Sequence, residues 1–182
     1  SQCGYCSRRE ADRLIEKGEV WINGTLATMG TKVMPGDTVM VHHTTITPCQ
    51  KEYLLAFHKP AGIVCTTSKI DKNNVIDYLN FPERIYPVGR LDKESTGLLL
   101  LTNNGQLMDD VLRGSNYHEK EYIVHVNKPI TDSVLQAMAQ GVPILDTITR
   151  PCKIRRMGKD CFYITLTQGL NRQIRRMCEY FD

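Results

Sequence analysis

The residues best suited to chemistry lie in the stretch 89–103, where one carboxylate stands between two cations. Asp92 is flanked by Arg90 and Lys93, and opposite charges close by keep a carboxylate ionised. An ionised carboxylate can act as a nucleophile or as a general base. The apolar run 98–101 predicts a buried strand, so Asp92 is expected on a loop leading into a rigid element. A solvated turn of the same composition is the alternative.

Further motifs accompany this stretch and together resemble a known family. In chain order they are His58-Lys59-Pro60-Ala61-Gly62, Pro87 to Gly105, His118-Glu119-Lys120-Glu121-Tyr122, and Gln168 to Met177. Their sequence and order resemble the RNA pseudouridine synthases of the RsuA group. The segments 141–145 and 152–153 are most similar to the F branch of the large-subunit ribosomal synthases.

The first part of the chain resembles an S4 RNA-binding domain. Ser7 and Glu10 form a capping-box pattern at the start of a helix that Gly18 ends. Asn23-Gly24 predicts a hairpin turn after the apolar run 20–22. The motif 6–12 is similar to that of S4 domains, which usually begin with an earlier helix. The resemblance therefore implies an incomplete S4-like domain over residues 1–43.

The rest of the chain alternates between strand and helix patterns. A linker is expected over residues 44–50, followed by a catalytic domain over 51–182 that lacks the strands with which the family normally ends. The fold class expected is α+β, with a mixed or antiparallel sheet and flanking helices. The segments with strand patterns are 38–41, 53–57, 98–101, 121–126 and 161–167; those with helical patterns are 75–79, 107–112, 131–140 and 174–181.

The resemblance implies a set of catalytic roles. Asp92 is the expected nucleophile, acting at the ribose C1′ or first removing a ribose proton, and Arg175 pairs with it. Tyr122 would stack on the target base near its C5 atom, although a core strand tyrosine is the alternative. Ile174 would pack against the base, and Arg90 would fill the gap left by the flipped nucleotide.

Charge indicates RNA as the partner. The net charge is +3, and residues 148–182 carry eight cations and three acids, a basic end that suits a polyanion. A helix over 174–181 would place Arg172 and Arg176 on one face, at the i, i+4 spacing. Ordinary solvated surface is the alternative for all of the candidates. The residues expected to bind RNA are Arg8, Arg9, Arg13, Lys59, Arg172 and Arg176.

Composition restricts the remaining classes. The seven scattered cysteines favour reduced thiols in a cytoplasmic protein. No apolar run is long enough to span a membrane. No cofactor and no metal are expected, because Cys3-x-x-Cys6 is a single pair and His42-His43 would point to opposite faces of a strand. A monomer is expected.

The leading hypothesis is isomerisation of a specific uridine in ribosomal RNA, 23S by branch similarity, to pseudouridine. A synthase acting on 16S ribosomal RNA or tRNA is one alternative. A non-catalytic RNA-binding or ribosome-assembly module is another, and a base glycosylase that also uses one carboxylate is a third. Asp92, Tyr122 and Arg175 together favour the enzyme, because binding alone would not require a buried carboxylate beside a polyanion.

Overall fold

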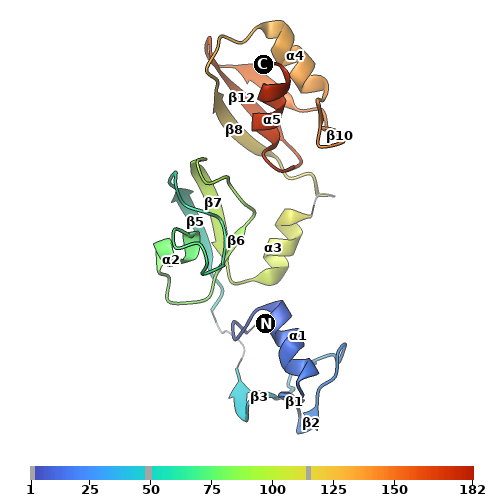
Figure 1. Cartoon of the computed structure of the whole chain (residues 1–182). Coiled ribbons are helices and arrows are strands. Elements are labelled where there is room, and N and C mark those ends of the chain that lie inside the picture. Colours follow the sequence, from blue (N-terminus) through green and yellow to red (C-terminus); the bar gives the residue numbers. More distant parts are fainter. Residues whose placement is uncertain (1–2, 48–50, 114–115) are drawn as a thin grey trace. The chain divides into compact units, whose positions relative to one another are not determined.

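A computed structural model of the chain describes residues 3–47, 51–113 and 116–182, and Figure 1 shows the elements in chain order. The chain divides into two compact units, Ser1–Met108 and Asp109–Asp182. The division lies inside α3 (Gly105–Leu112) and not at the segment 44–50, where a linker was predicted. The reason is that the region 51–182 contains two separate three-stranded sheets, one in each unit.

The N-terminal part of the first unit folds as its caps and turns predict. Helix α1 (Arg8–Glu16) begins after Ser7, whose hydroxyl oxygen accepts a hydrogen bond from the Glu10 N–H at 3.1 Å. Four short strands form an antiparallel sheet in the order β2-β1-β3-β4, and Leu14 packs into the apolar cluster that α1 shares with this sheet. The strands are β1 (Val20–Ile22), β2 (Thr25–Leu26), β3 (Val39–Val41) and β4 (Thr44–Ile46).

Strand β4 corrects the predicted linker. It pairs in register with β3, so the sheet extends to residue 46 and not to 43. His42 and His43 form the turn between these strands, with φ angles of +47° and +64°. The prediction that they lie on a strand was wrong, because two consecutive left-handed residues make a tight hairpin turn. Residues 48–50 of the predicted linker lie outside the described residues.

The first unit also contains an antiparallel sheet in the order β5-β7-β6. Its inner face packs Leu99 and Leu101 against Val75 of α2. Leu98 is 68% exposed, so the predicted buried run alternates between a core face and an open face. The elements are β5 (Leu54–Lys59), β6 (Tyr86–Val88), β7 (Gly97–Thr102) and α2 (Val75–Leu79).

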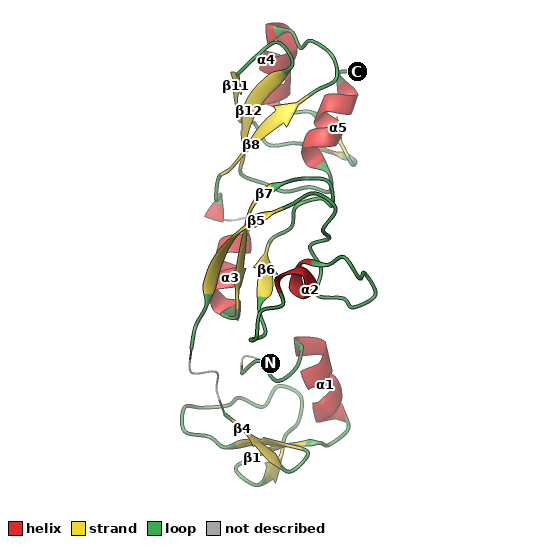
Figure 2. Cartoon of the chain, turned by 90° about the vertical axis from the view of Figure 1, so that its left-hand side faces the viewer, coloured by secondary structure: helices red, strands yellow, loops and turns green. Residues whose placement is uncertain are grey.

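The second unit is an antiparallel sheet in the order β11-β12-β8, with α4 and α5 against one face (Figure 2). Phe162 and Ile164 of β12 and Met177 of α5 are completely buried between them. The α+β class is confirmed, although β6, β9, β10 and β11 were not predicted. The elements are β8 (Lys120–His125), α4 (Asp132–Gln140), β9 (Pro143–Ile144), β10 (Thr147–Ile148), β11 (Lys153–Arg156), β12 (Cys161–Leu166) and α5 (Gln173–Tyr180).

Membrane-spanning helices were also sought in the ranges that the structure describes. Within those ranges, every helix is too short or too polar to cross a bilayer.

Candidate functional site

Asp92 lies on the loop 89–96, which joins the neighbouring strands β6 and β7. The side chain of Leu91 packs into the apolar cluster of the sheet, and its N–H points at Cys65 Sγ, 3.4 Å away. On the other side, the Ser95 N–H donates to the carbonyl oxygen of Asp92 at 3.0 Å. The backbone is therefore held on both sides of Asp92, while the residue itself is exposed. The expectation of a buried carboxylate was wrong, because the loop places Asp92 at the surface.

Lys59, which was predicted to bind RNA, is instead a buried residue. The side chain is 0% exposed, and its ammonium donates to the carbonyl oxygens of Pro60 at 2.7 Å, Ile63 at 2.9 Å and Lys93 at 3.0 Å. These bonds use all three donors of the ammonium group. A phosphate cannot reach a cation enclosed in this way, so the prediction was wrong. Strand alternation could have shown this, because Lys59 is in phase with the inward-facing Leu55 and Phe57.

Gly62 supplies a second connection to the loop that carries Asp92. Its N–H donates to the carbonyl oxygen of Lys93 at 2.8 Å, so that carbonyl accepts from both Gly62 and Lys59. The φ angle of Gly62 is +84°, a conformation in which most side chains would be strained. The motif 58–62 thus forms a polar connection between the loop after β5 and the loop of the candidate nucleophile.

Tyr122 lies on β8 in the second unit. It is half-buried, is paired in register with Ile164 of β12, and packs against the core of the unit. This position is compatible with stacking on the target base and with a structural role in the core, because a ring at the border of a core is held rigidly and is still partly exposed.

The remaining predicted catalytic and RNA-binding residues lie at the start of α5. Ile174 is half-buried against the same core as Tyr122, while Arg175 is exposed. Arg172 is the N-cap, in the left-handed conformation at φ +50°. The prediction that Arg172 shares a helical face with Arg176 was therefore wrong. The Arg176 guanidinium donates to the carbonyl oxygen of Asn171 at 3.1 Å.

Gln173 is a residue whose role the sequence did not reveal. It is 4% exposed. Its side-chain oxygen accepts from the Leu170 N–H at 3.0 Å, and its own N–H donates to the Leu170 carbonyl oxygen at 3.1 Å. This reciprocal pair fixes the turn 170–173, from which Ile174 and Arg175 follow. A polar residue at the first position of an amphipathic helix is an ordinary pattern, so the sequence carried no signal for it.

The structure thus places the predicted catalytic residues in two groups. Arg90 and Asp92 belong to the first unit, on one exposed loop. Tyr122, Ile174 and Arg175 belong to the second unit, where Tyr122 and Ile174 border one core. The pairing of Asp92 with Arg175 stays a prediction.

The arginines of α1 lie at the surface of the molecule. Arg8, Arg9 and Arg13 are all exposed, and Arg13 forms an ion pair with Glu10 at 3.4 Å. Arg8 and Arg9 lie in the first turn, where the helix dipole also favours an anion. This arrangement suits phosphate contacts and leaves the predicted RNA-binding role in place as a prediction.

Cys152 and Cys178 are partly buried cysteines of the second unit. Burial raises the pKa of the Cys152 and Cys178 thiols, and the nearby Glu179 raises that of Cys178 further. Both thiols therefore stay protonated and unreactive near neutral pH. Among the described residues, no three His, Cys, Asp or Glu side chains are grouped to hold a metal.

A family model for RNA pseudouridylate synthase matches residues 53–180, and one for the S4 domain matches residues 1–39. The chain belongs to the RNA pseudouridylate synthase family.

Its relatives are bacterial synthases. Dual-specificity RNA pseudouridine synthase RluF of Escherichia coli O6:H1 (strain CFT073) is 53% identical over the whole chain, which confirms the predicted branch. The chain spans 63% of the length of that relative. Ribosomal large subunit pseudouridine synthase B of Bacillus subtilis (strain 168) is 33% identical over 98% of the chain and 77% of its own length. A crystal structure of a pseudouridylate synthase matches with a TM-score of 0.67 and 25% identity, covering 98% of this chain and 79% of that one.

Proposed function

We propose that this chain isomerises a uridine of ribosomal RNA to pseudouridine, with Asp92 as the catalytic carboxylate acting on a flipped-out nucleotide. The observation that carries the proposal is the loop 89–96, which holds Asp92 by bonds on both sides and exposes its carboxylate. Catalysis gains most from groups that are already positioned before the substrate arrives. The Ser95 bond is one that any β-turn can form, but the packing of Leu91 and its contact with Cys65 tie this loop to the core, which a solvated turn would not need.

The reaction breaks the bond from C1′ to N1, turns the uracil, joins C5 to C1′ and releases the proton from C5. Asp92 acts as the nucleophile at C1′, and Arg175 pairs with it and orients it. Tyr122 stacks on the base, close to the C5 proton, and Ile174 packs against the base. Arg90 fills the gap that the flipped nucleotide leaves. Further phosphate contacts come from Arg172 and Arg176 and from the S4-like arginines Arg8, Arg9 and Arg13.

The proposed substrate is 23S ribosomal RNA, and tRNA is a second candidate. The large-subunit assignment draws on the name of the Bacillus subtilis relative. The words "dual-specificity" in the name of RluF are the reason to test a second class of RNA. We propose a cytoplasmic monomer, which gel filtration with light scattering would test.

The experiment measures tritium released from 5-tritiated uridine in unmodified 23S ribosomal RNA. We expect release by the unchanged chain and a loss of roughly 10²–10⁴-fold or more in Asp92→Asn, as for a positioned catalytic group. Glu94→Gln is the matched control, because Glu94 is an exposed carboxylate of the same loop, and it should release tritium normally.

Other outcomes separate the alternatives. RNA binding without tritium release by any of these proteins would favour a non-catalytic binding module. Free uracil in place of pseudouridine, seen by nucleoside chromatography, would favour a glycosylase. Release that is faster from tRNA or 16S ribosomal RNA would change the substrate and leave the chemistry as proposed.

A further inference from the structure

Three soft donor side chains meet at one end of the sheet in the second unit. Cys161 of β12 is the register partner of His125 on β8, and the two atoms Cys161 Sγ and His125 Nε2 are 3.7 Å apart. Met157, in the turn between β11 and β12, places its Sδ 3.6 Å from the same Sγ. We propose that Cys161, His125 and Met157 form a binding site for a soft monovalent cation, Cu(I).

The separations are those of atoms that share a metal ion. Metal–sulfur bonds are about 2.3 Å and metal–nitrogen bonds about 2.0 Å long, so two ligands of one ion lie roughly 3.5–4.0 Å apart. The Cys161–His125 and Cys161–Met157 distances both fall in this range. Cys161 Sγ therefore lies at a distance suited to sharing one ion with each of the other two donor atoms.

The backbone already holds the three residues in place. The N–H groups of Met157 and Gly158 both donate to the carbonyl oxygen of Cys161, at 3.0 and 2.9 Å. His125 is fixed opposite Cys161 by the β8–β12 ladder. A site that is organised before binding loses less conformational entropy when the ion arrives.

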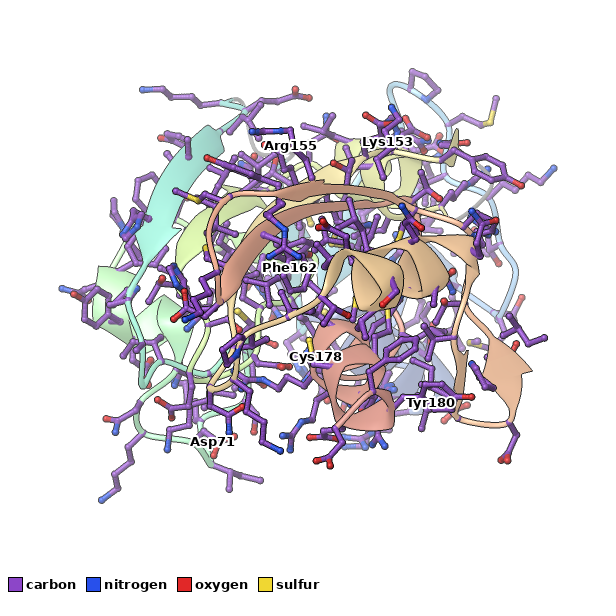
Figure 3. The ribbon with its side chains drawn as sticks, turned by 90° about the horizontal axis from the view of Figure 1, so that it is seen from above. Asp71, Lys153, Arg155, Phe162, Cys178 and Tyr180 are labelled. Carbon is purple, nitrogen blue, oxygen red and sulfur yellow. The ribbon has the colours of Figure 1, made fainter. Side chains whose placement is uncertain are left out.

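The site is open on the face of the sheet that α4 and α5 do not cover. Arg155 lies on this same face, because it pairs with the residue two positions after Cys161 in β12. Phe162 and Cys178 lie on the other side of the sheet, which the helices cover (Figure 3). Cys161 is 5% exposed, but Met157 is 54% exposed and His125 is also exposed. An ion can therefore approach past the thioether and the imidazole to reach the thiol.

The chemistry of the donors selects the ion. Thiolate and thioether sulfur are soft ligands that favour Cu(I), and imidazole suits copper as well. Structural zinc sites instead use four ligands from Cys and His. Binding would form a copper–thiolate bond and release the thiol proton to solvent, so the site needs no oxidant or reductant. The sequence predicted no metal here, because His125 and Cys161 lie on separate strands and the third ligand is a methionine in a turn.

The test titrates Cu(I) under reducing, oxygen-free conditions against the chromophoric chelator bicinchoninate. The protein is the full chain with Cys3→Ser and Cys6→Ser, which removes the Cys-x-x-Cys pair as a competing site. We expect one Cu(I) per chain, and an affinity reduced at least roughly tenfold, the loss typical even of outer-shell changes, by Met157→Leu or His125→Gln and most by Cys161→Ser. X-ray absorption should show a shell of sulfur and nitrogen that loses one sulfur in Met157→Leu.

Met29→Leu is the matched control, because Met29 is 56% exposed on the first unit, and it should bind Cu(I) normally. Met157→Leu changes an exposed side chain, so its fold is expected to persist, as circular dichroism would verify. An affinity unchanged by both Met157→Leu and His125→Gln would overturn the proposal. So would the absence of Cu(I) binding once Cys3 and Cys6 are replaced.

Discussion

The loop that carries Asp92 and the helix start that carries Arg175 both present an exposed side chain, but different interactions hold them. The loop is held by two donors, the buried ammonium of Lys59 and the N–H of Gly62. Both donate to the carbonyl oxygen of Lys93. The helix start is held by Gln173 and by the packing of Ile174 and Met177 in an apolar core.

The difference follows from the backbone in each region. A loop leaves its carbonyl oxygens without partners from regular structure, and a buried carbonyl without a donor is costly. One ammonium with three donors satisfies three of them at once. A helix pairs its own backbone beyond the first turn, so it needs a polar partner only at its beginning. Removal of the ammonium that supports the loop should therefore cost more stability than removal of the side chain that caps the helix start.

The largest effect is expected for Lys59→Met, which keeps the length of the side chain and removes its donors. The carbonyls of Pro60, Ile63 and Lys93 would lose a charged donor, and the free energy of unfolding should fall by about 3 kcal/mol or more. Tritium release from uridine, measured without denaturant, should fall roughly 10²-fold, because Asp92 would be misplaced. Urea unfolding and single-turnover assays would measure the two effects.

Lys93→Met is the matched control for this change. The side chain of Lys93 is exposed, and the contacts described for the residue use its backbone carbonyl. The control should therefore change stability by no more than about 0.5 kcal/mol. Equal destabilisation by the two variants would contradict the role assigned to the Lys59 ammonium.

A smaller effect is expected for Gln173→Ala at the start of α5. The Leu170 N–H would lose its acceptor, and the free energy of unfolding should fall by about 1–3 kcal/mol, the cost of one buried group left unpaired. Gln140→Ala, at an exposed helix end, should be nearly neutral in the same urea titration. A loss at Gln173 larger than that at Lys59 would reverse the comparison between the two regions.

The same contrast explains what the sequence could predict. Helix α1, the Asn23-Gly24 turn and strand β12 follow from local signals, namely a cap, a hairpin pair and a period of two. Motif similarity named Asp92, Tyr122 and Arg175 as candidates. It did not reveal that Lys59 faces inward or that Gln173 fixes a turn. Both roles depend on where backbone carbonyl and N–H groups lie in the folded chain, and the sequence does not give those positions.

Strand β4 was missed for a related reason. The segment 44–46 is rich in threonine and precedes Pro48, and such a composition is typical of linkers as well as of edge strands. The choice between them depends on whether β3 offers a free edge. That property belongs to the folded sheet and not to the segment itself.

The smallest effect on stability is expected at Asp37. Its side chain, like that of Lys59, joins separate groups of the chain by hydrogen bonds, but it does so near the surface. Its carboxylate accepts from the Met34 N–H at 2.7 Å and from the Asn23 side chain at 2.8 Å. These bonds, the Met34 N–H first, hold the pKa of Asp37 below its usual value of 3.8. The ionised form is therefore favoured by folding. Its stabilisation is complete above pH 3.8 and is lost as the pH falls through the lower pKa of the folded protein.

We expect Asp37→Asn to lower the thermal midpoint slightly at neutral pH and to have no effect well below the pKa of the folded protein, where Asp37 is protonated in both states. Melting curves between neutral and acidic pH would measure the difference between the two proteins. Because Asp37 lies near the surface and is only partly buried, this difference should be smaller than those at Gln173 and Lys59. A difference that grows as the pH falls would show that the Met34 N–H and Asn23 do not favour the carboxylate. The grading of these three connections by burial would then need another cause.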